Sequence, residues 1–299
     1  MFENDLSINN IIWSKGPLRN GYSEVQTETS SSKNTIMQII NSTPTNNIVF
    51  IRNGSNSCLS DLVIFADNLE LIKCPIILIT TDGDRDMPSS HEQRTITKIL
   101  GSNMIMKWYT QNYDGSIKHP KIKPFPIGFD LHSPQWLINN SIASKITFMI
   151  NTRILSPTNT RIKNKILSDT HNSFTHMERV DLYNMIQNNP NIDFSPSMSF
   201  SAITELYNKY NFVLSPRGGG LDCHRTWELF LAGVIVITKT SSLDEMYTKN
   251  NLPVVILKDW NELNDNLDTK LSNWYTEHID KTTMDNIYPR LTFNYWLQT

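Results

Sequence analysis

The sequence predicts an α/β protein of two domains, each built around a parallel sheet. Its 299 residues are enough for two domains of about 150 residues each. From residue 48 onward, short runs rich in β-branched residues alternate with longer segments of helical periodicity, a pattern typical of βαβ units. A proline-rich stretch, 119–134, interrupts this pattern before it restarts, so we expect the domain junction between 120 and 146.

The first half contains three apolar runs that predict strands. Residues 14–47 are rich in Ser, Thr, Asn and Gly and predict mostly loop. Pro120, Pro124 and Pro126 favour extended backbone in the residues before them, which excludes a helix there. The expected strands are 48–52, 75–81 and 104–110, and the expected helices are 59–69 and 91–100.

The second half repeats the alternation. The expected strands are 146–150, 211–214, 234–237 and 253–257, and the expected helices are 159–167, 201–210 and 222–232, with an irregular polar stretch after 167. We therefore expect an N-terminal, acceptor-side domain over 1–145 and a C-terminal, ligand-binding domain over 146–280. Residues 281–299 form a terminal segment that we expect to pack back on the first domain.

The composition excludes several classes of protein. A net charge of -2, from 27 basic and 29 acidic residues, argues against a broad surface for nucleic acid or anionic membranes. The longest apolar stretch, 229–237, is far shorter than the ~20 residues of a membrane span. Three scattered cysteines without a Cys-x-x-Cys pair argue against a disulfide framework or a structural zinc site. We expect a soluble, cytoplasmic protein without a metal.

A glycine-rich loop, "SPRGGGLDCHR", precedes the predicted helix 222–232. Because it follows the predicted strand 211–214, it would lie at the carboxyl edge of a parallel sheet, where such sheets bind ligands. It is neither a Walker loop nor a dinucleotide fingerprint, since Leu221 and Asp222 follow its glycines and Cys223 stands where a third spaced glycine belongs. The glycines that allow close backbone approach to a ligand are Gly218, Gly219 and Gly220.

Cations surround the start of this predicted helix. Asp222 is the expected N-cap, and Arg217, His224 and Arg225 lie around the first turn, where the helix dipole disfavours positive charge. An anionic ligand such as a phosphate reverses that penalty. Glu228, one turn beyond Arg225, is then placed to accept hydrogen bonds from ribose hydroxyls. The alternative is that Arg225 and Glu228 form a surface i,i+3 pair and that the glycines only make a tight turn.

Further candidate residues follow other predicted strands of the same half. Ser241 and Ser242 follow strand 234–237, and Ser242 with Glu245 predicts a capping box. They either contact the ligand or belong to an ordinary strand-to-helix connection. Asn151 and Arg153 follow the predicted strand 146–150, so we expect them at the same edge.

Acidic residues follow the predicted strand 75–81 in "TTDGDRD". One aspartate, Asp84 in preference to Asp82, is a candidate general base that takes the proton of an acceptor hydroxyl. Alternatively, Asp82-Gly83-Asp84 is a metal-binding Asp-x-Asp motif, or the loop is acidic only because Asp caps helices well. We favour the base, because the cations downstream already meet the charge of a phosphate.

The segment 214–238 resembles the donor-site signature of exostosin-like glycosyltransferases, and similar sequences occur in large DNA viruses. The resemblance extends from Asn211 to Trp260 and is weaker in the first half. It implies a GT-B fold of two Rossmann-like domains with a cleft between them. It also implies transfer of a sugar from a nucleotide-diphosphate sugar to a glycan or other hydroxyl acceptor, with inversion and without a cofactor.

Carried onto this chain, the resemblance assigns individual roles. Arg217 would contact the pyrophosphate, Arg225 would balance the charge of the phosphates, and Glu228 would bind the ribose. Gly219 departs from the pattern, in which this position is often polar. A non-catalytic nucleotide- or glycan-binding protein on the same fold is the main alternative, and the broken glycine pattern disfavours an oxidoreductase.

Overall fold

The computed structural model describes residues 10–16, 33–41, 47–53, 60–133 and 142–298. The chain forms two compact units. The N-terminal unit comprises 12–127 and 220–222, and the C-terminal unit comprises 1–11, 128–219 and 223–299. The division at 127/128 lies inside the junction region expected at 120–146 and before the expected domain boundary at 145. Residues 281–298 belong to the C-terminal unit, and the expected packing of the terminal segment on the first domain stays a prediction.

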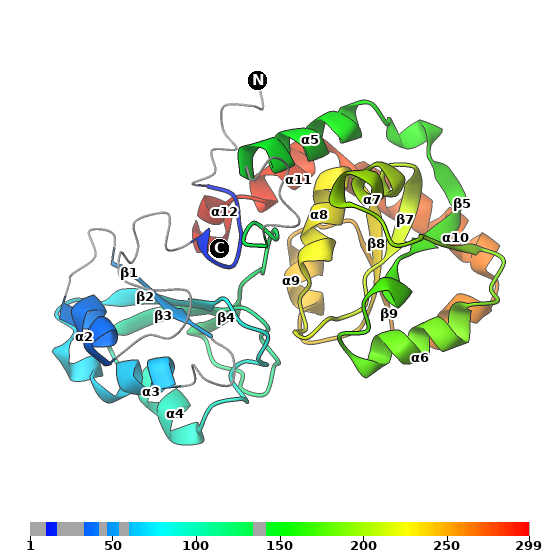
Figure 1. Cartoon of the computed structure of the whole chain (residues 1–299). Coiled ribbons are helices and arrows are strands. Elements are labelled where there is room, and N and C mark those ends of the chain that lie inside the picture. Colours follow the sequence, from blue (N-terminus) through cyan, green and yellow to red (C-terminus); the bar gives the residue numbers. More distant parts are fainter. Residues whose placement is uncertain (1–9, 17–32, 42–46, 54–59, 134–141, 299) are drawn as a thin grey trace. The chain divides into compact units, whose positions relative to one another are not determined.

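The N-terminal unit is built on a four-stranded parallel sheet of order β1-β2-β3-β4. Figure 1 shows its helices on one side of this sheet. Strand β1 is buried along its whole length, as expected for a uniformly apolar run in a parallel sheet. The elements are α2 (Lys33–Asn41), β1 (Ile48–Arg52), α3 (Ser60–Asp67), η1 (Leu69–Leu71), β2 (Ile76–Thr81), α4 (Gln93–Gly101), β3 (Ile105–Thr110) and β4 (Ile122–Pro124).

The C-terminal unit is built on a five-stranded parallel sheet of order β6-β5-β7-β8-β9. Its strands are β5 (Ile162–Ser168), β6 (Ile192–Phe194), β7 (Tyr210–Leu214), β8 (Ile235–Lys239) and β9 (Val254–Leu257). The helices beside them are α5 (Ile142–Ile154), α6 (Met177–Ile186), α7 (Phe200–Tyr207), α8 (His224–Ala232), α9 (Asp244–Lys249) and α10 (Leu267–His278). The chain ends in α11 (Met284–Arg290) and α12 (Phe293–Gln298), and short 3-10 turns occur at Thr158–Thr160, Thr170–Asn172, Trp260–Asn264 and Ile279–Thr282.

Helices cover both faces of this second sheet. Helices α6 and α10 lie on one face, and α5, α7 and α8 lie on the other (Figure 1). Side chains of α6 and α10, such as Leu182 and Leu271, share a buried apolar cluster with Phe212 and Ile235 of the sheet. Two helix-flanked parallel sheets confirm the predicted α/β class with two Rossmann-like domains.

Three of the predicted elements of the second half are wrong. Residues 146–150 belong to helix α5 instead of a strand, and residues 159–167 contain strand β5 instead of a helix. The stretch after 167, predicted to be irregular, contains helix α6 and strand β6. The run Ile146–Ile150 is short and apolar, and such a run fits a buried helix face as well as a strand. Ile146, Met149 and Ile150 are indeed the buried residues, at helical spacing.

Two arginines hold the C-terminal end of α8. Arg153 Nη1 donates to the Leu231 carbonyl at 2.8 Å, and Arg161 Nη1 donates to the Ala232 carbonyl at 2.9 Å. Gly233 ends the helix with φ 72°, and a Cβ there would lie 3.0 Å from Arg153 Cζ. Burial and the neighbouring Arg161 lower the pKa of Arg153 to about 10. Positive charge at a helix C-terminus complements the helix dipole.

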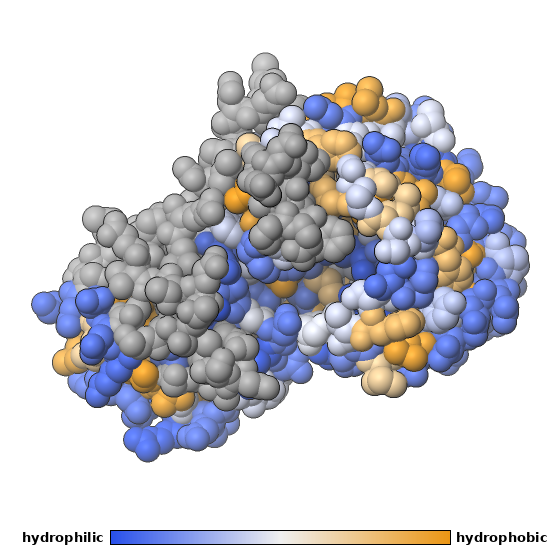
Figure 2. Space-filling view, viewed as in Figure 1, coloured by the Kyte–Doolittle hydropathy of each residue, from blue (hydrophilic) through white to orange (hydrophobic). Residues whose placement is uncertain are grey.

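The surface of the described part is predominantly hydrophilic on the face in Figure 2, with hydrophobic residues in small groups. The longest described helix, α5, has 13 residues, and no helix in the described ranges is long and apolar enough to cross a bilayer.

Candidate functional site

The candidate site lies at the carboxyl edge of the C-terminal sheet, between β5 and β7. After β5 the chain continues to β6 on one side, and it then crosses over to β7 on the other side of β5. The connections that leave β5 and β7 therefore diverge, and such a switch point is where open α/β sheets bind ligands. Asp169 follows β5, and the glycine-rich loop follows β7. In the N-terminal sheet, the described strands follow chain order and form no switch point.

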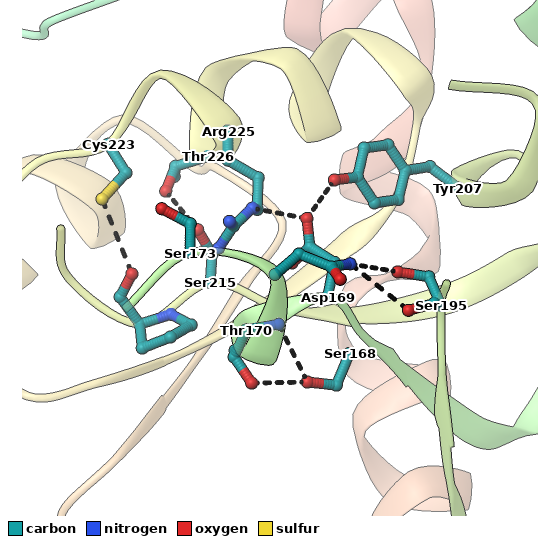
Figure 3. Close-up of polar contacts among 12 residues, drawn as sticks. Ser168, Asp169, Thr170, Ser173, Ser195, Tyr207, Ser215, Cys223, Arg225 and Thr226 are labelled. Carbon is teal, nitrogen blue, oxygen red and sulfur yellow. Dashed lines mark hydrogen bonds and ion pairs between the residues drawn. The ribbon is translucent and has the colours of Figure 1, made fainter. Parts of the chain in front are cut away.

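A buried ionic cluster of Asp169, Tyr207 and Arg225 occupies this switch point (Figure 3). Arg225 Nε lies 3.1 Å from Asp169 Oδ2, and the Tyr207 hydroxyl donates to the same oxygen at 2.6 Å. Burial disfavours the charge of Arg225, but Asp169 outweighs it, and the pKa of Arg225 rises. Burial and Asp169 raise the pKa of Tyr207 well above its usual range. Arg225 is therefore a permanent cation, and Tyr207 is a neutral donor.

Arg225 already has an internal counter-charge at the start of α8. The charge of Arg225 is met inside the protein by Asp169, so a ligand is not needed to offset it. Two polar atoms of the Arg225–Asp169 pair remain available for hydrogen bonds. Arg225 Nη1 and Asp169 Oδ1 are buried and have no hydrogen-bond partner among the described residues. Since buried polar groups are normally satisfied, these atoms are candidates for contact with a ligand or with water.

The loop after β7 is held by Arg179 of α6. Arg179 Nε donates to the Arg217 carbonyl at 2.8 Å, and its Nη1 donates to the Ser173 carbonyl at 3.0 Å. A Cβ at Gly218 would lie 3.3 Å from both Arg179 Nη2 and Cys223 Sγ. Gly218 therefore serves the packing of the loop against Arg179. The Arg217 side chain is partly exposed, and its Nη2 donates to the Gly219 carbonyl at 3.3 Å.

Glu228 is paired with a fully buried lysine of α5. Lys145 Nζ lies 2.7 Å from Glu228 Oε1, and the lysine side chain has 0% exposure, against 14% for the glutamate. The same ammonium donates to the Asp130 carbonyl at 2.6 Å and lies 4.3 Å from the centre of the Phe200 ring. The alternative of an Arg225–Glu228 surface pair is therefore wrong, since both residues are paired with other, buried partners.

His224, the first residue of α8, is held by the loop that follows residue 127. Its Nδ1 lies 2.8 Å from the Gly128 carbonyl, and its ring lies 5.4 Å from that of His132. Burial lowers the pKa of His224, although Asp130 acts in the opposite direction. A neutral ring is not disfavoured by the helix dipole. His224, like Arg225, therefore gives no reason to expect an anionic ligand at the start of α8.

The predicted N-cap of α8 is wrong by one residue. Cys223 is the N-cap, and its side chain makes no capping hydrogen bond to the helix. Asp222 lies within the N-terminal unit, where its Oδ2 accepts from the Ile127 amide at 2.8 Å and its amide donates to Asn112 Oδ1 at 3.0 Å. Gly220 packs against the same residue, since a Cβ there would lie 2.5 Å from Asn112 Nδ2. Gly220 is thus required by packing inside the protein.

The serines after β8 belong to a turn built around Asp244. The Ser241 amide donates to Asp244 Oδ1 at 2.8 Å, and Ser241 Oγ accepts from the Leu243 amide at 3.1 Å. Helix α9 begins at Asp244 with Leu243 as its N-cap, so the capping box predicted at Ser242 is wrong. Ser241 and Ser242 remain partly exposed at the carboxyl end of β8.

Asn151 and Arg153 were expected at this edge because a strand was predicted before them. Both lie instead in helix α5. Arg153 is at the C-terminal end of α8, opposite to the glycine-rich loop, and Asn151 is exposed. Asn151 and Arg153 therefore do not follow a strand of the sheet, and the prediction that placed them at its carboxyl edge is wrong.

The two candidate aspartates of the N-terminal unit differ in their surroundings. Asp82 has a left-handed φ of 65°, and its Oδ2 lies 2.8 Å from Arg52 Nε with 12% of the side chain exposed. Asp84 is exposed in the same loop at the carboxyl end of β2. The Arg52–Asp82 pair leaves Asp84 as the more exposed carboxylate of the two, and its role as a base stays a prediction.

Residues that the sequence did not single out complete the site: Asp169, Arg179, Tyr207 and Lys145. Asp169 and Arg179 lie in the stretch whose helix and strand were not predicted, so nothing indicated that they reach the edge of the sheet. Lys145 lies at the expected domain boundary. An apolar environment on α5, with Ile142, Ile146 and Met149 buried, was the available signal that this lysine is internal.

Comparisons with known proteins add a likeness in fold. No protein-family model matches the sequence, and no curated protein shows significant similarity. Among solved structures, the chain is similar to UDP-GlcNAc 2-epimerase from Methanocaldococcus jannaschii, with 11% identity, a TM-score of 0.34, and coverage of 86% of this chain and 78% of that one. It is also similar to a GtfA/B complex bound to UDP and GlcNAc, with 8% identity, a TM-score of 0.34, and coverage of 83% and 57%. The exostosin-like resemblance stays a prediction.

Proposed function

We propose that the C-terminal unit binds the diphosphate of a nucleotide-sugar and that the protein is a glycosyltransferase of the GT-B type. The observation that carries the proposal is the coincidence of the topological switch point with a glycine-rich loop, a helix start and an arginine whose side chain is only 15% exposed. The donor is a substrate, and the proposal includes no cofactor. The acceptor is a hydroxyl group, of a glycan or of another molecule.

Each residue of the site has a role in this proposal. Arg217 binds the diphosphate together with the amides at the start of α8, and Arg225 Nη1 offers a further donor. Arg179 keeps the loop in place through the Arg217 carbonyl. Lys145 holds Glu228 through Oε1, which leaves Oε2 to accept from ribose hydroxyls. Ser241 belongs to the next loop along the same edge and offers its hydroxyl to the donor.

Asp84 is the general base of the proposed reaction. It takes the proton of the acceptor hydroxyl while that oxygen forms a bond to the anomeric carbon of the donor sugar. On the opposite face, the bond from the anomeric carbon to the phosphate oxygen breaks, and the nucleoside diphosphate leaves with the electron pair. The product has inverted configuration. Positive groups at the diphosphate stabilise the charge that develops there.

Two alternatives make different demands on the same residues. A metal-dependent transferase would use Asp82-Gly83-Asp84, but the pairing of Asp82 with Arg52 engages one of the two carboxylates. A non-catalytic binding protein would keep the donor site and need no base. The Asp84→Asn variant separates the three, because it lowers only turnover under our proposal, weakens donor binding under the metal alternative, and changes nothing under the third.

The donor site is tested by thermal unfolding with UDP, GDP and CMP and their sugars. A nucleotide at 100 times its dissociation constant stabilises the fold by about 2.7 kcal/mol. Arg217→Ala should remove this stabilisation and leave the melting temperature of the free protein unchanged. Arg94→Ala, at an exposed arginine of the N-terminal unit, is the matched control. An undiminished nucleotide effect in Arg217→Ala would place the donor elsewhere.

A further inference from the structure

Asp130, His132 and His224 bring three metal-ligand groups together in the C-terminal unit. One ligand atom from each lies within 4.8 Å of the other two. Asp130 and His132 follow residue 127 in the proline-rich stretch, whereas His224 starts α8, so the sequence spacing gives no sign of the set. The glycosyltransferase proposal uses neither Asp130 nor His132.

The surroundings of His224 prepare it as a ligand. A carbonyl oxygen can only accept, so His224 Nδ1 donates its proton to Gly128 at 2.8 Å. In the neutral ring this fixes the tautomer and leaves a lone pair on Nε2. Metal-binding histidines characteristically donate their other ring nitrogen to a carbonyl or carboxylate in this way, which orients the ring and raises its basicity.

The carboxylate of Asp130 is fixed by its own turn. Its Oδ1 accepts from the Ser133 amide at 3.1 Å and from the His132 amide at 3.4 Å. Its carbonyl accepts from the buried Lys145 at 2.6 Å. Since Lys145 and Glu228 neutralise each other, the carboxylate of Asp130 leaves a local negative charge that a cation would offset.

The separations suit a small divalent ion. Zinc bonds of 2.0–2.1 Å in tetrahedral geometry place two ligand atoms about 3.4 Å apart. Asp130 Oδ1 and His132 Nδ1 are already 3.4 Å apart. The His132 side chain is 33% exposed, so it can turn to shorten the remaining separations.

We propose that Asp130, His132 and His224 bind a divalent transition-metal ion such as Zn²⁺ through two imidazoles and one carboxylate. A set of two histidines and one carboxylate leaves at least one coordination position open, as in catalytic and substrate-binding metal sites. Because Lys145 contacts both Asp130 and Glu228, the ion would share a positioning residue with the proposed ribose site. The proposal does not depend on the proposed function, because it concerns the free protein.

The test uses full-length protein without a polyhistidine tag, stripped with a chelator and titrated with ZnCl₂ in a calorimeter. We expect one Zn²⁺ per chain with micromolar or tighter affinity. His132→Ala should weaken binding by at least about 100-fold, since even the loss of an outer partner of a metal ligand costs 10–100-fold. His119→Ala, at a histidine of the N-terminal unit, should bind as the wild type does.

X-ray absorption of the zinc-loaded protein gives a second measurement. We expect two imidazoles in the wild type, at about 2.0–2.1 Å from the metal, and one in His132→Ala at saturating zinc. Circular dichroism checks that the variant is folded, and Asp130→Asn replaces it if it is not. Absence of binding at millimolar zinc would overturn the proposal, as would equal affinity in the wild type, His132→Ala and Asp130→Asn.

Discussion

The structure predicts that Lys145→Met destabilises the fold strongly. Methionine keeps most of the length of the side chain but removes the ammonium that pairs with Glu228 and donates to the Asp130 carbonyl. Breaking a buried ion pair by removing one partner costs about 3–5 kcal/mol, because the other charge stays behind. The 14% exposure of Glu228 lowers this cost, whereas the orphaned carbonyl adds about 1–3 kcal/mol. We expect a total loss of about 3–5 kcal/mol.

The assay is urea unfolding followed by circular dichroism and tryptophan fluorescence. Lys249→Met is the matched control, since Lys249 pairs with Glu245 at the surface, where both side chains are about 70% exposed. Such a pair is worth about 0.3–0.5 kcal/mol. In addition, Glu228→Gln in the Lys145→Met background should recover part of the loss. If Lys145→Met lost no more than about 1 kcal/mol of stability beyond Lys249→Met, the buried Lys145–Glu228 pair would be refuted. Strict additivity of Lys145→Met and Glu228→Gln would refute it as well.

Three further outcomes are expected. Asp84→Asn should lower turnover by roughly 10²–10⁴-fold with unchanged nucleotide affinity, measured by product formation and calorimetry, and equal turnover would remove Asp84 from the mechanism. Burial, and then Arg85, lower the pKa of His91 to about 4. The contribution of His91 to stability is therefore complete above pH 6.5 and is lost as the pH falls towards 4. His91→Gln should reduce the pH dependence of the urea midpoint, and an unchanged dependence would contradict this assignment. Gly233→Ala should lower the free energy of unfolding by about 1–2 kcal/mol, because φ at this position is 72°. Gly101→Ala, where a Cβ meets nothing within 4 Å, is the control and should not destabilise the protein. Equal urea midpoints of the two variants would exclude backbone strain at Gly233.

The sequence was most informative where one local signal decided the structure. The strands β1, β2, β3, β7, β8 and β9 were predicted because each is a short and mostly apolar run, as is typical of a buried parallel sheet. Helix α5 and strand β5 were exchanged for each other. The run 146–150 has no periodicity long enough to separate the two, and β5 is stabilised by its neighbours β6 and β7, which are distant in sequence.

The candidate site shows the same limit. The loop with Arg217 and the helix start after it were predicted from adjacent residues. The partners of those residues were not, because they are set by the order of the strands. Arg225 meets Asp169 only because β5 lies beside β7, and Glu228 meets Lys145 only because α5 packs against α8. The sequence therefore identified the charged groups but assigned their charges to a ligand when internal partners were present.

The arginines at the end of α8 have a mechanical consequence. Arg153 and Arg161 grip the last carbonyls of this helix, and Gly233 leaves no space between the helix end and Arg153. These contacts fix the C-terminal end of α8, which is the end away from the glycine-rich loop. A rearrangement that admits a ligand would then involve the glycine-rich loop and its hydrogen bonds to Arg179, while α8 keeps its position. Loss of the Arg153 or Arg161 contacts would therefore weaken ligand binding at the glycine-rich loop, although no residue of that loop is changed.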